Sequence, residues 1–339
     1  MKPRFLFCLA LATFATGACA ADETYSPPAS PRFVYNFNPD WKFIRQDGTN
    51  AETADFDDSK WTTVSTPHTF NDTDSYDHII SHSGGDRHAW TGIVWYRKHF
   101  KLPARDAGDK IFLEFEGIRQ AARFWVNGHF VGLYENGVTP CGLDLTRFVK
   151  FGEADNVVAV KVDNRTDYKE AATGVPFEWE GRAFNPDYGG LHSDERLILT
   201  GKIYQTLPLY ENLKTSGTYI YPSNFNIQGH TCDLNIESQV RNESGKPESI
   251  TLWGLIVDAD GKPCAKFQTE ALNLAAGQTE VFTASCKLKD GKFWSDVSPN
   301  LYDVHTMLSV DGRVVDAQKI RTGFRKTEFK GGVGTGGVY

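Results

Sequence analysis

Apolar and polar residues alternate with a period of two along most of the chain. In residues 110–117 (KIFLEFEG) the apolar positions 111, 113 and 115 fall on one face, and residues 233–240 (DLNIESQV) repeat the pattern. This is the period of a β-strand that buries one of its faces. The sequence shows no amphipathic helix of four turns. We therefore expect a protein made of half-buried strands.

Tight-turn dipeptides separate these strands. Asn127-Gly128, Asp260-Gly261 and Asp311-Gly312 accept the positive φ angles that hairpin turns require. Short strands joined by such turns are typical of antiparallel sandwiches. The sequence thus predicts an all-β fold.

A domain boundary is expected near Leu207-Pro208, because a fresh set of alternating strands begins there. The first domain, residues 31–208, has the length of a jelly-roll, galactose-binding-like sandwich with loop insertions. The second, residues 209–330, has the length and strand spacing of an immunoglobulin-like sandwich.

Two long loop regions, residues 67–90 and 167–192, interrupt the first predicted domain. Segments of this length inside a compact domain are usually functional or disordered. Both are rich in aromatic, carboxylate, histidine and asparagine residues, a mixture that disordered linkers seldom contain. They are therefore candidates for a binding site.

The first twenty residues have the order of a secretory signal. Lys2 and Arg4 precede an apolar run, which ends before Ala18-Cys19-Ala20. The run is short for a membrane span. We expect an exported protein, periplasmic or extracellular, with signal peptide 1–20; lipid attachment at Cys19 is the alternative.

The charge of the chain argues against two kinds of partner. The net charge is −7, and loss of Lys2 and Arg4 with the signal would make it two units more negative. An acidic surface repels nucleic acid and anionic lipid, so neither is expected as a partner, and no membrane span is expected in the rest of the chain. After cleavage the cysteines are Cys141, Cys232, Cys264 and Cys286. The compartment would allow disulfides, but the sequence does not fix their pairing.

The last residues, EFKGGVGTGGVY, contain Gly332, Gly334 and Gly337 in the spacing of a dinucleotide-binding turn. That site needs a following helix within a βαβ unit, and the sequence offers neither. A flexible tail or the first turn of another domain remain as interpretations, and no cofactor is expected.

Several motifs in order resemble glycoside hydrolase family 2, the family of β-galactosidases, β-mannosidases and β-glucuronidases. They are WTGIVWYRKHFKLP, EFEGIRQAARFWVNGHFVGLYENGVTPCGLDLT, NVVAVKVDNR and YGGLHSDERLIL, followed by WSDVSPNLYDVHTML and RTGFRKTEF. The resemblance covers nearly the whole chain after the signal. It implies a sugar-binding domain followed by an immunoglobulin-like domain.

The resemblance also implies what lies beyond Tyr339. Family members continue into a (β/α)₈ barrel that carries both catalytic glutamates, so residues 331–339 resemble the start of the hairpin entering that barrel. We therefore expect no catalytic residue in this chain, which alone would be inactive. Asn242-Glu243 matches the family's acid/base dipeptide, but it ends a strand and precedes Ser244-Gly245, which indicates a turn.

Metal and nucleophile motifs are weak. HIISH, residues 78–82, lacks the glutamate of a zinc-protease helix, and the acidic run 71–77 lacks the glycine and terminal glutamate of a calcium loop. No metal site is expected.

The two long loops carry side chains suited to sugar, whose rings present apolar faces to aromatic residues and hydroxyls to polar ones. Packing within the loops is the alternative for each residue. The candidate substrate-binding residues are His68, Asn71, Asp72, Trp90, Trp179, Asn185, Asp187 and Tyr188.

Two hypotheses follow. The first is the non-catalytic N-terminal region of an exported family 2 glycosidase of β-galactosidase type, with a β-glycoside and the barrel of the same polypeptide as partners. The second is a stand-alone carbohydrate-binding or adhesion module.

Overall fold

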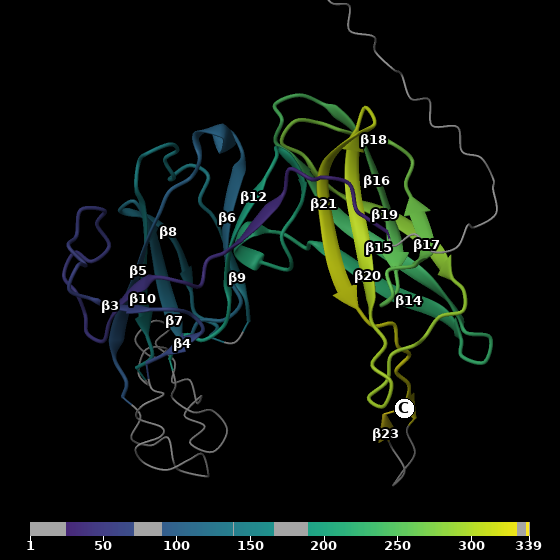
Figure 1. Cartoon of the computed structure of the whole chain (residues 1–339), viewed down its shortest axis with the longest axis horizontal. Coiled ribbons are helices and arrows are strands. Elements are labelled where there is room, and N and C mark those ends of the chain that lie inside the picture. The colour runs from purple at the N-terminus through teal and green to yellow at the C-terminus, as the bar shows by residue number, and fades with distance from the viewer. Residues whose placement is uncertain (1–24, 71–89, 138, 166–188, 331–336, 339) are drawn as a thin grey trace, which may run out of the picture.

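Two antiparallel β-sandwiches stand side by side in the computed structural model (Figure 1), which describes residues 25–70, 90–137, 139–165, 189–330 and 337–338. The all-β prediction is confirmed, as are the jelly-roll and immunoglobulin-like assignments. Predicted signal residues 1–20 lie outside the described part. Within that part, no helix is both long and apolar enough to cross a membrane.

The first sandwich, within the described residues, packs a four-stranded sheet against a six-stranded sheet, and every neighbouring pair of strands is antiparallel. The smaller sheet has the order β1 (Phe33–Asn36), β12 (Glu195–Thr200), β6 (Lys110–Phe115) and β9 (Cys141–Asp144). The larger has the order β3 (Thr62–Val64), β2 (Trp41–Ile44), β5 (Ile93–Phe100), β10 (Asn156–Asp163), β7 (Ala121–Val126) and β8 (His129–Tyr134). A short 3₁₀ helix, η2 (Ala104–Asp106), follows β5.

The core of the first sandwich lies between its two sheets, where alternate residues of each strand meet. In β6 these are Ile111, Leu113 and Phe115, the positions that the period-two pattern selected, and all three are fully buried. Phe115 packs its ring against Phe124 of β7 at 5.1 Å between centroids. Burial of such aromatic area stabilises this layer.

The second sandwich also has two sheets in the described residues. One contains β13 (Ile203–Gln205), β15 (Thr231–Asn242), β14 (Thr218–Asn226) and β19 (Thr279–Leu288), with β15 pairing with the other three. The other contains β17 (Pro263–Gln268), β16 (Glu248–Val257), β20 (Tyr302–Val310), β21 (Arg313–Thr322) and β18 (Leu272–Leu274). The 3₁₀ helix η3 (Glu211–Leu213) precedes β14, and the short strands β22 (Phe329–Lys330) and β23 (Gly337–Val338) pair near the end.

Two of the three predicted dipeptides form tight hairpin turns, whereas in Asp260-Gly261, between β16 and β17, Gly261 alone has a positive φ, of 82°. Asn127 and Gly128 connect β7 to β8 with φ angles of 51° and 83°. Asp311 and Gly312 connect β20 to β21 with φ angles of 48° and 74°. Positive φ at both central residues gives the turn a twist that matches the right-handed twist of the flanking strands.

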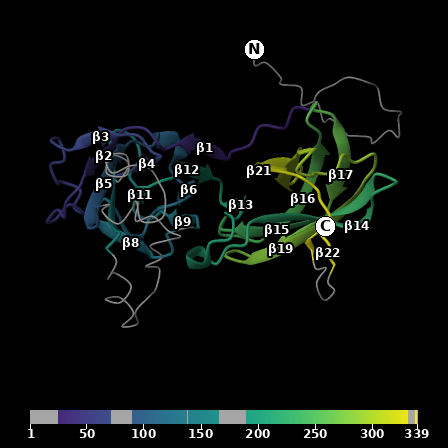
Figure 2. The ribbon, with the colours of Figure 1, turned by 90° about the horizontal axis from the view of Figure 1, so that it is seen from below.

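Strand β13 lies between the two sandwiches (Figure 2) and pairs with β15 of the second. It precedes Pro208, where the sequence predicts the boundary, so the chain joins the second sandwich's sheet before that residue. A small apolar cluster joins the two sandwiches around it. Its members are Phe112, Ile198, Tyr204, Leu207 and Tyr210.

Charged pairs flank this apolar contact. Lys110 of β6 places its ammonium 2.9 Å from Glu243, which follows β15, and 2.6 Å from Asp144. Arg32 forms a two-pronged contact with Asp316 of β21, at 2.7 and 2.9 Å. These pairs are more than half buried, so they fix the relative placement of the two sandwiches more firmly than exposed pairs would.

The segment before β1 crosses the second sandwich before the chain enters the first (Figure 1). The amide of Tyr25 donates to the carbonyl of Gly261 at 3.0 Å, in the turn between β16 and β17. The Tyr25 ring meets His305 of β20 edge-on, at 5.1 Å. Residues 25–30 therefore form a cover on the outer face of the second sandwich.

Candidate functional site

The ends of the two long loops meet at one end of the first sandwich. Strand β4 (His68–Thr69), where the first loop begins, pairs with β11 (Gly190–Leu191), where the second loop ends. The first loop ends before β5 and the second begins after β10, and those two strands pair along their length. All four loop ends are thus held by hydrogen-bonded strands of one sandwich.

Glycine is required where β4 and β11 meet. Gly190 has a φ of 126°, which L side chains rarely adopt, and a Cβ there would lie 2.5 Å from the carbonyl oxygen of His68 and 2.7 Å from the hydroxyl of Tyr96. Its amide and carbonyl also pair with those of Arg119, at 2.8 and 2.9 Å. The backbone can approach this closely only because no side chain intervenes.

His68 is packed among aromatic rings at this junction. Its Nδ1 lies 2.8 Å from the hydroxyl of Tyr96, and its ring meets Phe43 edge-on at 4.7 Å. The side chain is half-buried. These contacts fix the orientation of the imidazole and occupy one of its two nitrogens within the protein.

Trp90 lies at the other end of the first loop. The guanidinium of Arg45 lies 4.9 Å above its ring, and Phe70 meets the ring edge-on at 5.4 Å. Arg45 also donates to the carbonyl of Phe70 at 3.2 Å. A cation over an indole face with a second aromatic at its edge holds the ring in one orientation.

Asn164 ties the two loops together on the β5–β10 side. Its side-chain oxygen accepts a hydrogen bond from the backbone amide of Gly92 at 2.8 Å. Its backbone amide donates to the carbonyl of Gly92 at 3.2 Å. Next to it, Arg165 donates from two guanidinium nitrogens to the carboxylate of Asp163. The shorter of these contacts, from Nη2 to Oδ2, is 2.7 Å. Sequence reasoning missed Arg45 and Asn164, whose roles depend on partners distant in sequence.

The structure therefore brings His68 and Trp90 to the same end of the sandwich, and each is engaged by neighbouring side chains. The other candidate residues lie outside the described residues, and their assignment stays a prediction. They are Asn71, Asp72, Trp179, Asn185, Asp187 and Tyr188.

A buried carboxyl lies close behind the loop ends. Glu195 begins β12, four residues after β11, and is fully buried. Burial raises the pKa of its carboxyl from the usual 4.5 to about 8, against the opposing hydrogen bond from Thr66. Burial also lowers the pKa of the Lys98 ammonium nearby. The loop ends thus rest on a polar cluster with little access to water.

The described residues contain no group of three or more histidine, cysteine or acidic side chains that could hold a metal ion. The four cysteines predicted to remain after cleavage are free thiols. Glu243, the second residue of the family-like dipeptide, contacts Lys110 and Arg241 at 2.9 and 2.7 Å and accepts from Tyr204 at 3.1 Å. It is part of the contact between the sandwiches.

Two family models match this chain. Residues 35–180 match "Glycosyl hydrolases family 2, sugar binding domain", and residues 218–325 match "Glycosyl hydrolases family 2". The first match covers β2 to β10 of the first sandwich and ends before β11 and β12, and the second covers most of the second sandwich.

Curated relatives carry two activity names. A β-glucuronidase of Formosa agariphila is 38% identical over 303 residues, which is 89% of this chain and 30% of that protein. A β-galactosidase of Thermoanaerobacter pseudethanolicus is 29% identical over 299 residues, or 88% of this chain and 36% of that protein. The chain thus spans about a third of the length of these relatives.

Solved structures agree in fold. A β-glucuronidase from glycoside hydrolase family 2 superposes with a TM-score of 0.81 at 35% identity, over 90% of this chain and 32% of that one. A β-glucuronidase of Bacteroides uniformis gives a TM-score of 0.75 at 27% identity, over 91% of this chain and 34% of that one.

Proposed function

Because the chain belongs to family 2 of the glycosyl hydrolases, we propose that it is the N-terminal, sugar-binding part of a β-glucuronidase. The observation that carries the proposal is the 38% identity over 303 residues to the β-glucuronidase of Formosa agariphila. The β-galactosidase of Thermoanaerobacter pseudethanolicus, at 29%, supports β-galactosides as the second candidate substrate. This ordering replaces the β-galactosidase type that the sequence alone suggested.

In this proposal the two long loops form one wall of the sugar subsite. Their convergence on the β4–β11 and β5–β10 pairs supports a shared wall. The β4 end of the first sandwich and the β22–β23 hairpin lie toward the same side of the molecule (Figure 1), which favours a following domain that faces the loops. The aromatic and polar residues of the loops would bind the apolar faces and the hydroxyls of the sugar.

The hydrolytic step itself is assigned to a barrel domain of the whole polypeptide. A retaining glycosidase needs two carboxyl groups about 5 to 5.5 Å apart, one as nucleophile and one as acid/base. In this chain Glu243 is held by Lys110 and Arg241 instead, which supports a structural role. We therefore expect only background hydrolysis by residues 1–339.

Chromogenic β-glucuronide and β-galactoside test the proposal when assayed with this chain and with the product of its complete reading frame. We expect the complete product to hydrolyse the glucuronide with the higher kcat/KM. A higher kcat/KM for the galactoside would overturn the substrate assignment. A reading frame without a barrel would favour the stand-alone binding module, and turnover by this chain that is lost in Glu243→Gln would refute the structural role of Glu243.

Export is a further part of the proposal, supported by the charged, apolar and small-residue order of residues 1–20. The mass of the protein recovered from cells distinguishes the alternatives. A mature chain that begins at Ala21 is expected. A chain that begins at Cys19 with added lipid would select the anchored form, and one that retains Met1 would refute export.

A further inference from the structure

The end of the second sandwich that leads into β22 carries a cavity of about 480 Å³. Ile227 and His230, from the connection between β14 and β15, line one part of it. The loop between β19 and β20 lines another part with Lys292 and Trp294, and Lys326 lines it just before β22. This cavity, together with the tip of the β19–β20 loop beside it, is called the end surface below.

Hydrogen bonds hold the β19–β20 loop in one shape. The backbone amides and carbonyls of Ser295 and Ser298 pair with each other, at 3.0 and 3.2 Å, which leaves residues 296–297 at the tip of a tight turn. The amide of Trp294 donates to the carbonyl of Phe324 at 2.8 Å, so the turn is fixed to the segment after β21. The tip is therefore a built part of the surface.

Val297 is an unusual residue for this tip, since turns favour small and polar side chains. It is 88% exposed, more than any other large apolar side chain in the described part of the chain. Its neighbour Asp296 accepts the amide of Val297 at 3.0 Å. Ile227, at the cavity, is 52% exposed, and Trp294 is partly exposed. Exposed apolar residues are ordinary singly, but a group of them beside a cavity indicates a contact surface.

The end surface is also cationic. None of the described residues that line the cavity is acidic, whereas His230, Lys292 and Lys326 are basic. Lys326 forms an ion pair with Glu328, but the exposed ammonium of Lys292 has no ion pair within the described residues. A complementary partner should therefore bring apolar side chains to the tip and a carboxylate to Lys292.

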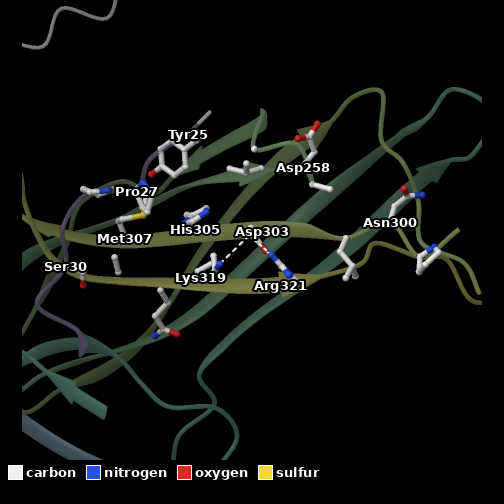
Figure 3. A pocket seen from close by; sticks show the side chains of 18 residues that line it. Tyr25, Pro27, Ser30, Asp258, Asn300, Asp303, His305, Met307, Lys319 and Arg321 are labelled. Atoms are coloured by element: carbon white, nitrogen blue, oxygen red, sulfur yellow. Dashed lines mark hydrogen bonds and ion pairs between the residues drawn. The ribbon is translucent and has the colours of Figure 1, made fainter. Parts of the chain in front are cut away.

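The larger cavity of the second sandwich, under residues 25–30, is occupied by the chain itself. The Tyr25 ring packs on His305 at 5.1 Å. Asn300 lines both cavities and lies at the end of the larger one away from Tyr25 (Figure 3). Residues 25–30 do not line the cavity of the end surface, so this part of the second sandwich has no cover from that segment.

The chain passes along the end surface on its way to β22. Lys326 lines the cavity, and β22 pairs with β23 at the same end of the second sandwich (Figure 1). This chain covers 30% of the Formosa agariphila β-glucuronidase, and the function proposed above places a barrel after β23. A domain tethered so close would be present at the end surface at a high effective concentration.

We propose that the end surface is the docking site of the domain that follows β23 in the whole polypeptide. That domain covers Val297 and Ile227 with apolar side chains and places a carboxylate against Lys292. The inference rests on the proposed function, which supplies the domain, and it gives the second sandwich the role of fixing that domain's position.

Hydroxyl-radical footprinting of Trp294 and Val297 tests this site in the present chain and in the product of its complete reading frame. We expect both side chains to be labelled in this chain and to lose their labelling in the complete product, because a docked domain excludes water. Equal labelling of the two proteins overturns the docking site and leaves the proposed function intact. A complete product without a further domain overturns both. Protection in this chain that grows with protein concentration would assign the surface to a second copy instead and overturn the proposal.

Val297→Asp places a carboxylate on the tip of the loop. In this chain it should leave the urea midpoint unchanged, because the side chain is exposed. In the complete product the carboxylate would be buried without a partner, so protease cleavage between β23 and the following domain should become about tenfold faster. Val281→Asp, at an exposed position of β19 outside the cavity, is the matched control and should leave that rate unchanged. Equal cleavage rates in the two variants overturn the proposal.

Lys292→Glu tests the charge of the contact in the same cleavage assay. Lys289→Glu, in the same loop but outside the cavity, is its control. Faster cleavage in Lys292→Glu alone is expected, because like charges then face each other. The same rate in both variants would overturn the carboxylate contact with Lys292.

Discussion

The phenol of Tyr210 donates a 2.6 Å hydrogen bond to the carboxylate of Glu114 across the contact between the two sandwiches. Both residues are buried, and burial together with the Glu114 charge raises the pKa of the phenol, so it remains a donor throughout the working pH range. The ring of Tyr210 lies against the backbone of Gly142, where a Cβ would come within 2.5 Å of it. This contact, and not the chain connection alone, sets how the sandwiches sit together.

Tyr210→Phe keeps the ring in place and removes this donor. Because Glu114 is only 7% exposed, its carboxylate would lose a partner that water cannot easily replace. We expect a loss of about 1–3 kcal/mol in the free energy of unfolding. Urea unfolding of Tyr210→Phe and of Tyr219→Phe, whose tyrosine is exposed, measures the difference; equal stabilities would show that Arg196, 3.3 Å from Glu114, suffices as its partner.

Arg97 is a fully buried cation that organises residues 45–61. It donates to Asp58 at 2.8 Å and to the carbonyls of Ala51 and Thr53 at 2.5 and 2.8 Å. Arg97→Met would remove this donor from all three acceptors, of which Asp58 keeps a contact with His99 Nε2 at 3.0 Å. We expect a loss of about 3–5 kcal/mol in stability.

Arg97→Lys restores the charge without the planar fork and should recover only part of that loss. Arg123→Met, on the exposed face of the neighbouring part of the same sheet, is the control and should be near neutral. Thermal and urea unfolding measure all three variants. Full recovery in Arg97→Lys would mean that charge, and not the hydrogen-bond geometry, holds residues 45–61.

Much of this fold was readable from the sequence. The period-two pattern predicted β6 and β15, and the Asn-Gly and Asp-Gly dipeptides predicted the β7–β8 and β20–β21 turns, because each signal is local. The contact between the sandwiches was not predictable. Lys110 and Glu243 are far apart in sequence, and neither residue carries a local mark of the other.

The candidate site was readable in part, for a similar reason. Loop length and composition pointed to residues 67–90 and 167–192, and the strands around them hold the loop ends together. The sequence could not reveal that His68 is hydrogen-bonded to Tyr96. The sequence pattern around a polar loop residue is the same whether its side chain faces a ligand or a neighbouring ring.

Glu195 predicts a pH-dependent stability. Its folded pKa of about 8 exceeds the usual 4.5, so between these values the folded protein keeps a proton that the unfolded chain has released. Stability should therefore fall as pH rises through this window, by at most about 1.4 kcal/mol per pH unit. Glu195→Gln keeps an acceptor for Thr66 and cannot ionise, so it should remove this slope.

Urea unfolding at about pH 5 and about pH 8 measures the slope as a difference between the two stabilities. Glu280→Gln, at an exposed position of β19, should keep the wild-type slope. The lowered pKa of Lys98 acts at alkaline pH with the opposite sign, and the Glu195 charge opposes that lowering. A wild-type slope in Glu195→Gln would mean that another group titrates in this window.

Gly190→Ala tests whether the β4–β11 pair holds the two loop ends together. Gly190 combines a φ of 126° with a Cβ position 2.5 Å from the His68 carbonyl oxygen, whereas Gly277 has a φ of 77° and open space around its Cβ position. Gly277→Ala should cost about 1–2 kcal/mol for positive φ alone. Gly190→Ala should cost clearly more, because β4 and β11 must also separate.

Hydrogen exchange of the amides that join these two strands distinguishes the effects: faster exchange there in Gly190→Ala, but not in Gly277→Ala, is the expected result. Equal costs with unchanged exchange would show that the backbone adjusts without breaking the pair, and the loop ends would then not depend on this glycine.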